Sequence, residues 1–158
     1  MTDKARIGMA AVLACLIAAP AEGLRQWAYR DPVGILTVCM GHTGRDVVPG
    51  RKYSLVECDR FLDVDMKRAI WAVEMCAPGL PPHVLAAFGD AVFNVGPRIA
   101  CGPGSTAARY LAAGDIEAAC NELPKWDKAR VAGQLIALPG LTKRRAKERH
   151  LCLTGELP

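Results

Sequence analysis

The sequence lacks several patterns that mark common classes of protein. Its seven cysteines form no C-x-x-C pair, which argues against zinc ribbons and thioredoxin-type redox motifs. Its three histidines, His42, His83 and His150, are too scattered for a recognised zinc-ligand pattern. No internal repeat or low-complexity tract is evident. We therefore expect a protein that uses no metal and no other cofactor.

The uncharged run from Ile7 to Ala21 is short for a permanent membrane span. As a helix it would extend roughly 22 Å, whereas the hydrocarbon core of a bilayer is about 30 Å thick. Six of its fifteen residues are alanine, so the hydrophobic gain per residue is small. Because Lys4 and Arg6 precede the run and favour the cytoplasm, everything after Ala21 would lie outside.

Three interpretations of residues 1–21 remain open. The end of the run, A-P-A (19–21), resembles the cleavage site of a signal peptide. The second interpretation is a lipoprotein signal ending at Cys15, although the residues before this cysteine, V-L-A (12–14), match such a signal imperfectly. The third interpretation is an uncleaved signal-anchor, hydrophobic enough for export but too weak to be permanent. The remaining residues, 22–158, are expected to form one domain.

Length and composition fit a globular protein. The chain has 158 residues, of which 51% are hydrophobic and 23% charged, a balance that provides a buried core and argues against disorder. Its net charge of +4 suits an anionic partner such as wall polymer, nucleic acid or lipid headgroups. Six of the seven cysteines follow residue 22, and this even number indicates disulfides in an oxidising compartment such as the periplasm.

Turn, strand and cap signals outline the first half of the domain. Residues 31–34 fit a type I turn, because Asp is first, Pro second and Gly last. The alternating, β-branched stretch 35–40 predicts a strand. Ser54 and Glu57 fit a capping box that begins a long helix, which the proline-rich segment 77–82 ends.

Further helices are predicted in the second half of the chain. They cover residues 83–94, 105–113, 115–123 and 142–153, with Asp115 as an N-cap and loops at Gly114, Pro124 and Pro139-Gly140. The fold class expected from these elements is α+β and mainly helical. A small β-element joined by a long helix to a helical lobe would leave a cleft between two lobes.

Glu22, Asp31 and Thr37 are candidates for glycosidic chemistry. Hydrolysis of a glycosidic bond needs one protonated carboxyl group and one ionised carboxyl group. The apolar run beside Glu22 would favour its protonated form, whereas solvent and turn amides would keep Asp31 ionised. The Thr37 hydroxyl on the adjacent strand would help to hold a water beside Asp31. Taken alone, the three residues also fit a solvated Glu, a turn Asp and a strand Thr.

The same stretch resembles the active-site signature of phage-type lysozymes, glycoside hydrolase family 24. That signature, E-G-x-R, Y-x-D, x2-G, x2-T, x3-G-H, is matched in register by residues 22–25, 29–31, 34, 37 and 41–42. The similarity continues in "AVFNVGPR" (91–98), in "STAARYLAAGDIEAACNEL" (105–123) with Trp126, and in "GLTKRRAKERHLC" (140–152). It therefore covers most of the chain after residue 21.

The resemblance implies a lysozyme-like two-lobe fold and a role for each candidate residue. Glu22 would be the catalytic acid, Asp31 would position or deprotonate the attacking water, and Thr37 would assist. The substrate would be the β-1,4 bond between N-acetylmuramic acid and N-acetylglucosamine in peptidoglycan, cleaved with inversion. The Glu22 and Asp31 carboxyls should then stand about 6.5–9.5 Å apart, which leaves room for the water. We expect a monomer that binds no nucleic acid.

Some endolysins of this family carry a signal-anchor-release segment, and residues 7–21 resemble one. Cleavage after Ala21 would place a charged α-amino group beside Glu22 and oppose proton donation. We therefore expect uncleaved export, inactive tethering to the host inner membrane, and release into the periplasm when the membrane depolarises.

Three disulfides are proposed: Cys39–Cys58, Cys76–Cys101 and Cys120–Cys152. The sequence alone allows other connectivities. Cys15 is then free, and such a cysteine most often acts as a small apolar residue. An alternative is thiol exchange with Cys39 after release, as in relatives that have a cysteine in place of the catalytic Asp. The presence of Asp31 in this chain argues against that form of control.

Three further sets of residues have two interpretations each. His42 is expected either to pair with Asp65 on the long helix or to contact only its own loop. Asn94 and Arg98 are candidates for sugar contact or for a structural role at a helix end. The basic residues of the last helix form a solvated face or attract wall polymer or lipid; they are Lys143, Arg144, Arg145, Lys147 and Arg149.

Other activities remain as alternatives. A lytic transglycosylase of the same bond needs the acid but no activated water, and it would release a 1,6-anhydro sugar. A zinc amidase is opposed by the scattered histidines, and metal content would decide. A non-enzymatic membrane-disrupting protein would use the apolar run and the basic last helix, and it would still lyse cells after Glu22→Gln.

Overall fold

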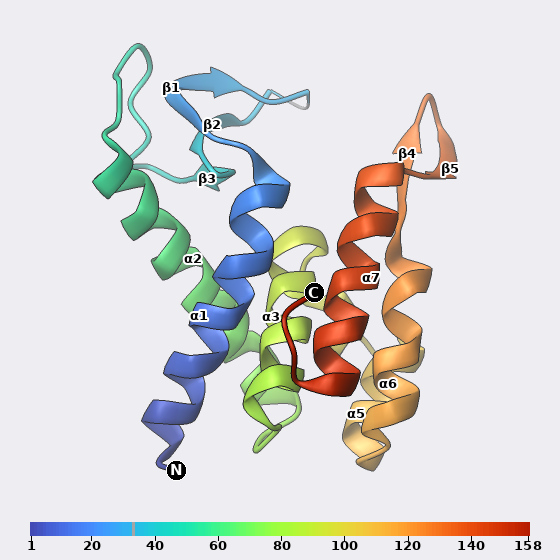
Figure 1. The fold of residues 1–158 in the computed structure, drawn as a ribbon. Helices are drawn as coiled ribbons and strands as arrows, with labels where there is room; N and C mark the ends of the chain where they lie inside the picture. The colour runs from blue at the N-terminus through green and yellow to red at the C-terminus, as the bar shows by residue number, and fades with distance from the viewer. Residues whose placement is uncertain (33) are drawn as a thin grey trace.

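A computed structural model describes residues 1–32 and 34–158 as a mainly helical α+β fold (Figure 1). The helices are α1 (Asp3–Glu22), α2 (Leu55–Cys76), α3 (Pro82–Val95), α4 (Arg98–Cys101), α5 (Thr106–Ala113), α6 (Ile116–Glu122) and α7 (Pro139–Thr154), with a 3-10 turn η1 (Leu123–Trp126). The strands are β1 (Arg25–Arg30), β2 (Leu36–Cys39), β3 (His42–Thr43), β4 (Lys128–Val131) and β5 (Gln134–Ala137). The predicted fold class is confirmed.

Two small antiparallel sheets lie at the same end of the helical body (Figure 1). The first has the order β1-β2-β3 and follows α1 directly, so it places the candidate catalytic stretch beside the end of that helix. The second is the β4-β5 hairpin beside the start of α7, which the sequence patterns did not predict. Its turn residues, Ala132 and Gly133, both have positive φ (48° and 82°), as a tight two-residue hairpin requires.

The predicted cap signals are confirmed. The Ser54 side chain accepts from the Glu57 amide at 3.1 Å and the Glu57 carboxylate accepts from the Ser54 amide at 2.8 Å. Asp115 caps α6 by accepting from the Ala118 amide at 3.1 Å. The predicted loop at Pro139-Gly140 is wrong, because both residues lie in the first turn of α7, where proline has no helical hydrogen bond to lose.

The turn predicted over residues 31–34 is described only in part, because Val33 lies outside the described residues. Among the described residues of this turn, the Gly34 amide donates a hydrogen bond to the Asp31 carbonyl at 2.9 Å. The strand predicted over residues 35–40 is confirmed as the shorter β2.

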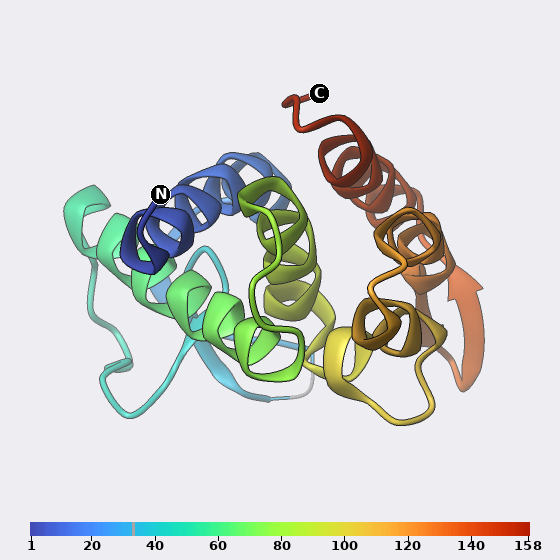
Figure 2. The ribbon, with the colours of Figure 1, turned by 90° about the horizontal axis from the view of Figure 1, so that it is seen from below.

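Helix α1 is a core element that packs on α2 and α3 (Figure 2). Its inner face is made of small and aliphatic side chains, which let the helices approach closely; they are Ala10, Ala11, Ala14, Ile17 and Ala18. The outer face is apolar too, with Met9, Val12 and Leu16 exposed. Within the described ranges, α1 is the helix long and apolar enough to cross a membrane, although a core helix passes the same test. It continues without a break across the expected 21/22 boundary.

An ion pair attaches the start of α1 to the end of α2. Arg6 donates to Glu74 at 2.6 and 3.0 Å and to the Leu80 carbonyl at 3.0 Å. The hydrogen bonds and charge of Arg6 hold the pKa of Glu74 below its ordinary value. Of the two basic residues that precede the apolar run, Lys4 is exposed, whereas Arg6 is buried in the folded protein.

Three disulfides connect elements that are distant in sequence. Cys39–Cys58 joins β2 to the start of α2, Cys76–Cys101 joins the end of α2 to α4, and Cys120–Cys152 joins α6 to α7. The structure therefore has the three pairs proposed from the sequence, and Cys15 on α1 is free. Burial raises the pKa of the Cys15 thiol to about 11.

Candidate active site

Glu22 is the last residue of α1, and its side chain is 21% exposed. The helix ends at Gly23, whose φ of 71° turns the chain towards β1. Gly41, with φ of 84°, lies opposite the carboxyl group: a Cβ at this position would be 3.6 Å from Glu22 Oε2. A glycine here accommodates the left-handed backbone and leaves that side of the acid open.

A buried arginine holds Glu22 from the other side. Arg144 of α7 donates through one nitrogen to Glu22 and through two others to Asp90 of α3, at 2.6 and 3.0 Å. Burial by itself would lower the pKa of Arg144, but the hydrogen bonds and charges of Asp90 and Glu22 outweigh it and raise that pKa. Because Asp90 is fully buried, its negative charge offsets much of the positive charge that Arg144 presents to Glu22.

Two more buried charges support this arrangement. Arg145 and Glu148 are both fully buried and are joined at 2.6 Å, and Arg145 also donates to the Asn94 side chain at 3.0 Å. Burial raises the pKa of Glu148 well above its ordinary value. The interpretation of the last helix as a solvated basic face is therefore wrong for Arg144 and Arg145, which turn inward. Lys143, Lys147 and Arg149 are exposed, and this exposure fits both alternatives, a solvated face and a surface that attracts wall polymer or lipid.

Asp31 and Thr37 both form hydrogen bonds with the backbone of Ile35. The Ile35 amide donates to Asp31 Oδ1 at 2.8 Å, and the Asp31 amide donates to the Ile35 carbonyl at 2.9 Å. The buried Thr37 hydroxyl donates to the same carbonyl at 3.0 Å, and Thr37 is paired with Tyr29 across β1 and β2. The two candidate residues are thus linked by the backbone of the turn that leads from β1 to β2.

A cavity of about 480 Å³ lies between the first sheet, α2 and α3. Its lining includes Glu22, Thr43, Asp65, Phe93 and Asn94. Of the predicted residues, Glu22, Asp65 and Asn94 therefore meet at one cavity. In the described part of the chain, Asp31 and Thr37 do not line it.

Arg98 is likewise outside the described lining of this cavity. It is exposed at the start of α4, with its guanidinium 6.0 Å from the centre of the Trp126 ring. This position is consistent with the structural alternative that the sequence left open for Arg98.

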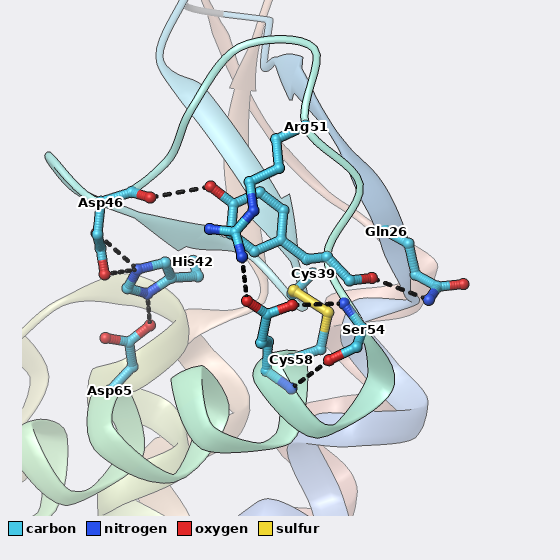
Figure 3. Close-up of a disulfide and its surroundings, with 10 residues drawn as sticks. Gln26, Cys39, His42, Asp46, Arg51, Ser54, Cys58 and Asp65 are labelled. Carbon is cyan, nitrogen blue, oxygen red and sulfur yellow. Dashed lines mark hydrogen bonds and ion pairs between the residues drawn. A yellow bond between two sulfur atoms is a disulfide. The ribbon is translucent and has the colours of Figure 1, made fainter.

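His42 joins the first sheet to α2 (Figure 3). Its Nδ1 is 2.7 Å from Asp65 and its Nε2 is 3.1 Å from Asp46, while its ring stacks on Phe61 at 3.9 Å. The structure thus brings together the predicted pair of His42 and Asp65. Because Asp65 lines the cavity, this pair fixes one wall of it relative to the sheet.

A second cavity, of about 620 Å³, lies on the other side of Glu22, between the last turn of α1 and the start of α7. Glu22 and Asn94 line both cavities. Over residues 1–32 and 34–158, no cluster of three or more His, Cys, Asp or Glu side chains could hold a metal ion.

Sequence reasoning missed Asp90 and the inward role of Arg144. The signal that was available is the spacing of the inward residues of α7, which follow one helix face and alternate with exposed lysines; they are Arg144, Arg145, Glu148, Leu151 and Cys152. That pattern indicates a buried face that contains charges, but it does not identify their partners.

Comparisons with known proteins agree on one family. The phage lysozyme family model matches residues 19–148. The chain is 36% identical to the SAR-endolysin of Bacteriophage PS119, over 94% of this chain and 89% of that protein. The muramidase domain of SpmX from Asticaccaulis excentricus has 27% identity and a TM-score of 0.79, covering 89% and 95% of the two chains. The active form of P1 phage endolysin Lyz has 28% identity and a TM-score of 0.70, covering 90% and 84%.

Proposed function

The chain belongs to the phage lysozyme family, and from that membership we propose that it is an endolysin that lyses the host cell by hydrolysing peptidoglycan. The bond cleaved is the β-1,4 bond between N-acetylmuramic acid and N-acetylglucosamine. The observation that carries this proposal is the position of Glu22, at the junction of two cavities and held by Arg144.

Glu22 acts as the general acid in this proposal and protonates the leaving oxygen. To donate a proton it must be neutral, and an isolated arginine beside it would oppose this. Asp90 reduces that effect because it takes two of the Arg144 hydrogen bonds and supplies a compensating charge. Arg144 then serves to orient the carboxyl group, and Asp90 serves to orient Arg144.

Asp31 and Thr37 activate or position the attacking water. The Ile35 amide donates to Asp31 Oδ1 and so fixes the orientation of the carboxyl group that would hold the water. A water between the two carboxyl groups requires a separation of about 6.5–9.5 Å and leads to inversion at the anomeric carbon. That separation and the inverting outcome are predictions of the proposal.

The test is Glu22→Gln assayed on purified peptidoglycan. We expect the rate of release of reducing sugar to fall by at least about 10²-fold, because proton transfer contributes that much. Glu156→Gln is the matched control, since Glu156 is exposed near the C-terminus and lies in neither cavity.

The products distinguish the alternatives. An inverting hydrolase releases the α-anomer first, which NMR detects before mutarotation; a β-anomer would contradict inversion. A 1,6-anhydro product would identify a lytic transglycosylase. Unchanged lysis of cells by Glu22→Gln would identify a membrane-disrupting protein.

The N-terminal helix acts as a signal-anchor in this proposal. The chain is tethered, inactive, in the host inner membrane and then released into the periplasm. Two features support it: α1 is apolar on all sides, and α1 leads directly into Glu22, so an active enzyme needs this helix out of the bilayer. Sequencing the N-terminus of the periplasmic form tests it, and a form that begins at Glu22 would refute it.

A further inference from the structure

An exposed tryptophan and an exposed lysine lie side by side at the outer edge of the first sheet. Trp27 of β1 forms an antiparallel bridge with Lys52, which lies just before α2. The backbone hydrogen bonds flank this pair instead of joining it, an arrangement that brings two facing side chains close together on one side of the ribbon. Trp27 is 58% exposed, and Lys52 is exposed too. We call these two residues the edge pair.

The segment that contains the edge pair carries most of the net charge of the protein. Residues 23–54 have five arginines and lysines against two aspartates, a net charge of +3 within the total of +4. Both aspartates already have partners: Asp31 accepts from a backbone amide, and Asp46 lies 3.1 Å from a ring nitrogen of His42. Exposed Leu24 and Val48 add apolar surface to the same segment. The segment is therefore both basic and apolar on its outside.

The first sheet is fixed to α2 by contacts that do not involve α1. The disulfide Cys39–Cys58 joins β2 to α2, and His42 of β3 pairs with Asp65 of the same helix (Figure 3). Helix α1 packs mainly on the helices α2 and α3. We therefore expect the sheet to keep its structure both when α1 packs on the protein and when α1 lies in a bilayer.

Chain connectivity places this sheet at the membrane surface in the tethered state. The sheet lies at the end of α1 opposite to the N-terminus, and the chain from Glu22 to Arg25 spans at most about 11 Å (Figure 1). The apolar run is also about 8 Å shorter than the hydrocarbon core, a mismatch that draws the flanking residues into the interface. Tryptophan is enriched at that depth, because its ring is apolar and its N–H is polar.

We propose that the edge pair docks on the anionic headgroups of the bilayer that holds α1, with the Trp27 ring in the interface and Lys52 against lipid phosphates. This inference rests on the proposed signal-anchor, because it adds a second contact with the same membrane. The contact strengthens a short anchor while the chain is tethered. The folded protein keeps the contact surface after release, because both residues are exposed in the packed structure.

The test measures binding of the full-length, released protein to two kinds of vesicle. One contains phosphatidylglycerol with phosphatidylethanolamine, and the other contains phosphatidylcholine. The edge variant is Trp27→Ser/Lys52→Gln. The matched control is Trp71→Ser/Lys67→Gln, which removes the same two residue types from one exposed face of α2. The two variants therefore have the same net charge and the same number of tryptophans.

We expect the edge variant to bind the anionic vesicles at least about tenfold more weakly than the unmodified protein. One cation near an anionic surface contributes about fivefold, and burial of the ring adds to this. The control should bind like the unmodified protein. Tryptophan emission should shift to the blue on binding in the unmodified protein and the control, but not in the edge variant, which keeps Trp71 and Trp126.

Three results would overturn the inference. The first is equal binding of the anionic vesicles by the edge variant and the unmodified protein. The second is loss of binding in the control alone, which would assign the contact to α2. The third is equal binding of the two kinds of vesicle by the unmodified protein, because anionic headgroups would then have no part in it.

Hydrolysis of purified peptidoglycan separates this inference from the proposed activity. In the described part of the chain, Trp27 and Lys52 line neither cavity, so the edge variant should release reducing sugar at the rate of the unmodified protein. If the unmodified protein bound vesicles but released no sugar, the proposed hydrolysis would fail. If it released sugar and the edge variant bound vesicles normally, only the docking surface would fail. Failure of the anchor has a different signature, a periplasmic form that begins at Glu22.

Discussion

Glu74→Gln should loosen the attachment of α1 to the rest of the protein. Arg6 and Glu74 are joined by two hydrogen bonds between charged groups, and their side chains are only 11% and 13% exposed. Removing the charge of Glu74 leaves the Arg6 guanidinium buried without its main counter-charge, a loss that costs about 3–5 kcal/mol when no other partner remains.

Other contacts reduce that cost. Arg6 keeps its bond to the Leu80 carbonyl and a pairing with exposed Asp3 at 3.2 Å. We therefore expect the free energy of unfolding to fall by about 2 kcal/mol, near the cost of one hydrogen bond to a charged group. For a domain of this size that loss lowers Tm by about 6 °C.

The pH dependence gives a second, independent readout. Because Arg6 lowers the pKa of Glu74, the pair stabilises the protein fully above the ordinary carboxyl pKa, and this stabilisation is lost as the pH falls through the lowered value. The difference in Tm between the two proteins should be complete at pH 7 and should shrink below about pH 4.

Thermal unfolding followed by circular dichroism at pH 7 and pH 3.5 measures both effects. Glu156→Gln is the control, because Glu156 is exposed and in no described ion pair. A Glu74→Gln protein whose Tm lies within 2 °C of this control, about a third of the expected shift, would refute the reasoning. A difference in Tm that is the same at pH 7 and pH 3.5 would refute it too.

The remaining predictions concern Asp90, Cys15 and Ser54. Asp90→Asn removes the charged partner that holds two Arg144 nitrogens, so Arg144 should orient Glu22 less well and kcat should fall at least about tenfold; an unchanged kcat would contradict this. Since burial raises the pKa of Cys15 to about 11, iodoacetamide at pH 8 should alkylate it about 10²-fold more slowly in the folded protein than in urea, as mass spectrometry would show. Cys15→Ser should lyse cells normally, and a loss of lysis would favour thiol exchange with Cys39. Ser54→Ala removes the cap of α2 and should lower stability by about 1 kcal/mol, or about 3 °C in Tm; no change would contradict a stabilising role for the capping box.

Local signals in the sequence predicted most of the helices and, in the first sheet, strand β2. The capping box of α2 and the Asp115 cap of α6 involve residues three apart, so the pattern alone contains the interaction. The hairpin β4-β5 was missed because Val131, Leu135 and Ile136 are exposed, and a hairpin without a buried face has no alternation to read.

The residues of the candidate site also divide into those that a local sequence signal identifies and those that it does not. Glu22, Asp31 and Thr37 lie within sixteen residues of one another, and the resemblance of this stretch to the signature of phage-type lysozymes identified them as candidates. Their supports come from farther away. Arg144 is 122 residues from Glu22 and 54 residues from Asp90, so the local sequence, although its helical spacing indicates an inward face, does not identify these partners.

The family, the main helices and an apolar first helix that ends in an acid can all be inferred from the amino-acid sequence. The packing of distant segments places this helix in the protein core, pairs Arg6 with Glu74 and brings Arg144 to both Asp90 and Glu22. Caps and turns can be predicted because they depend on neighbours along the chain. The partner of a buried charge depends on which distant surfaces pack together, and it is set by the free energy of removing that charge from water.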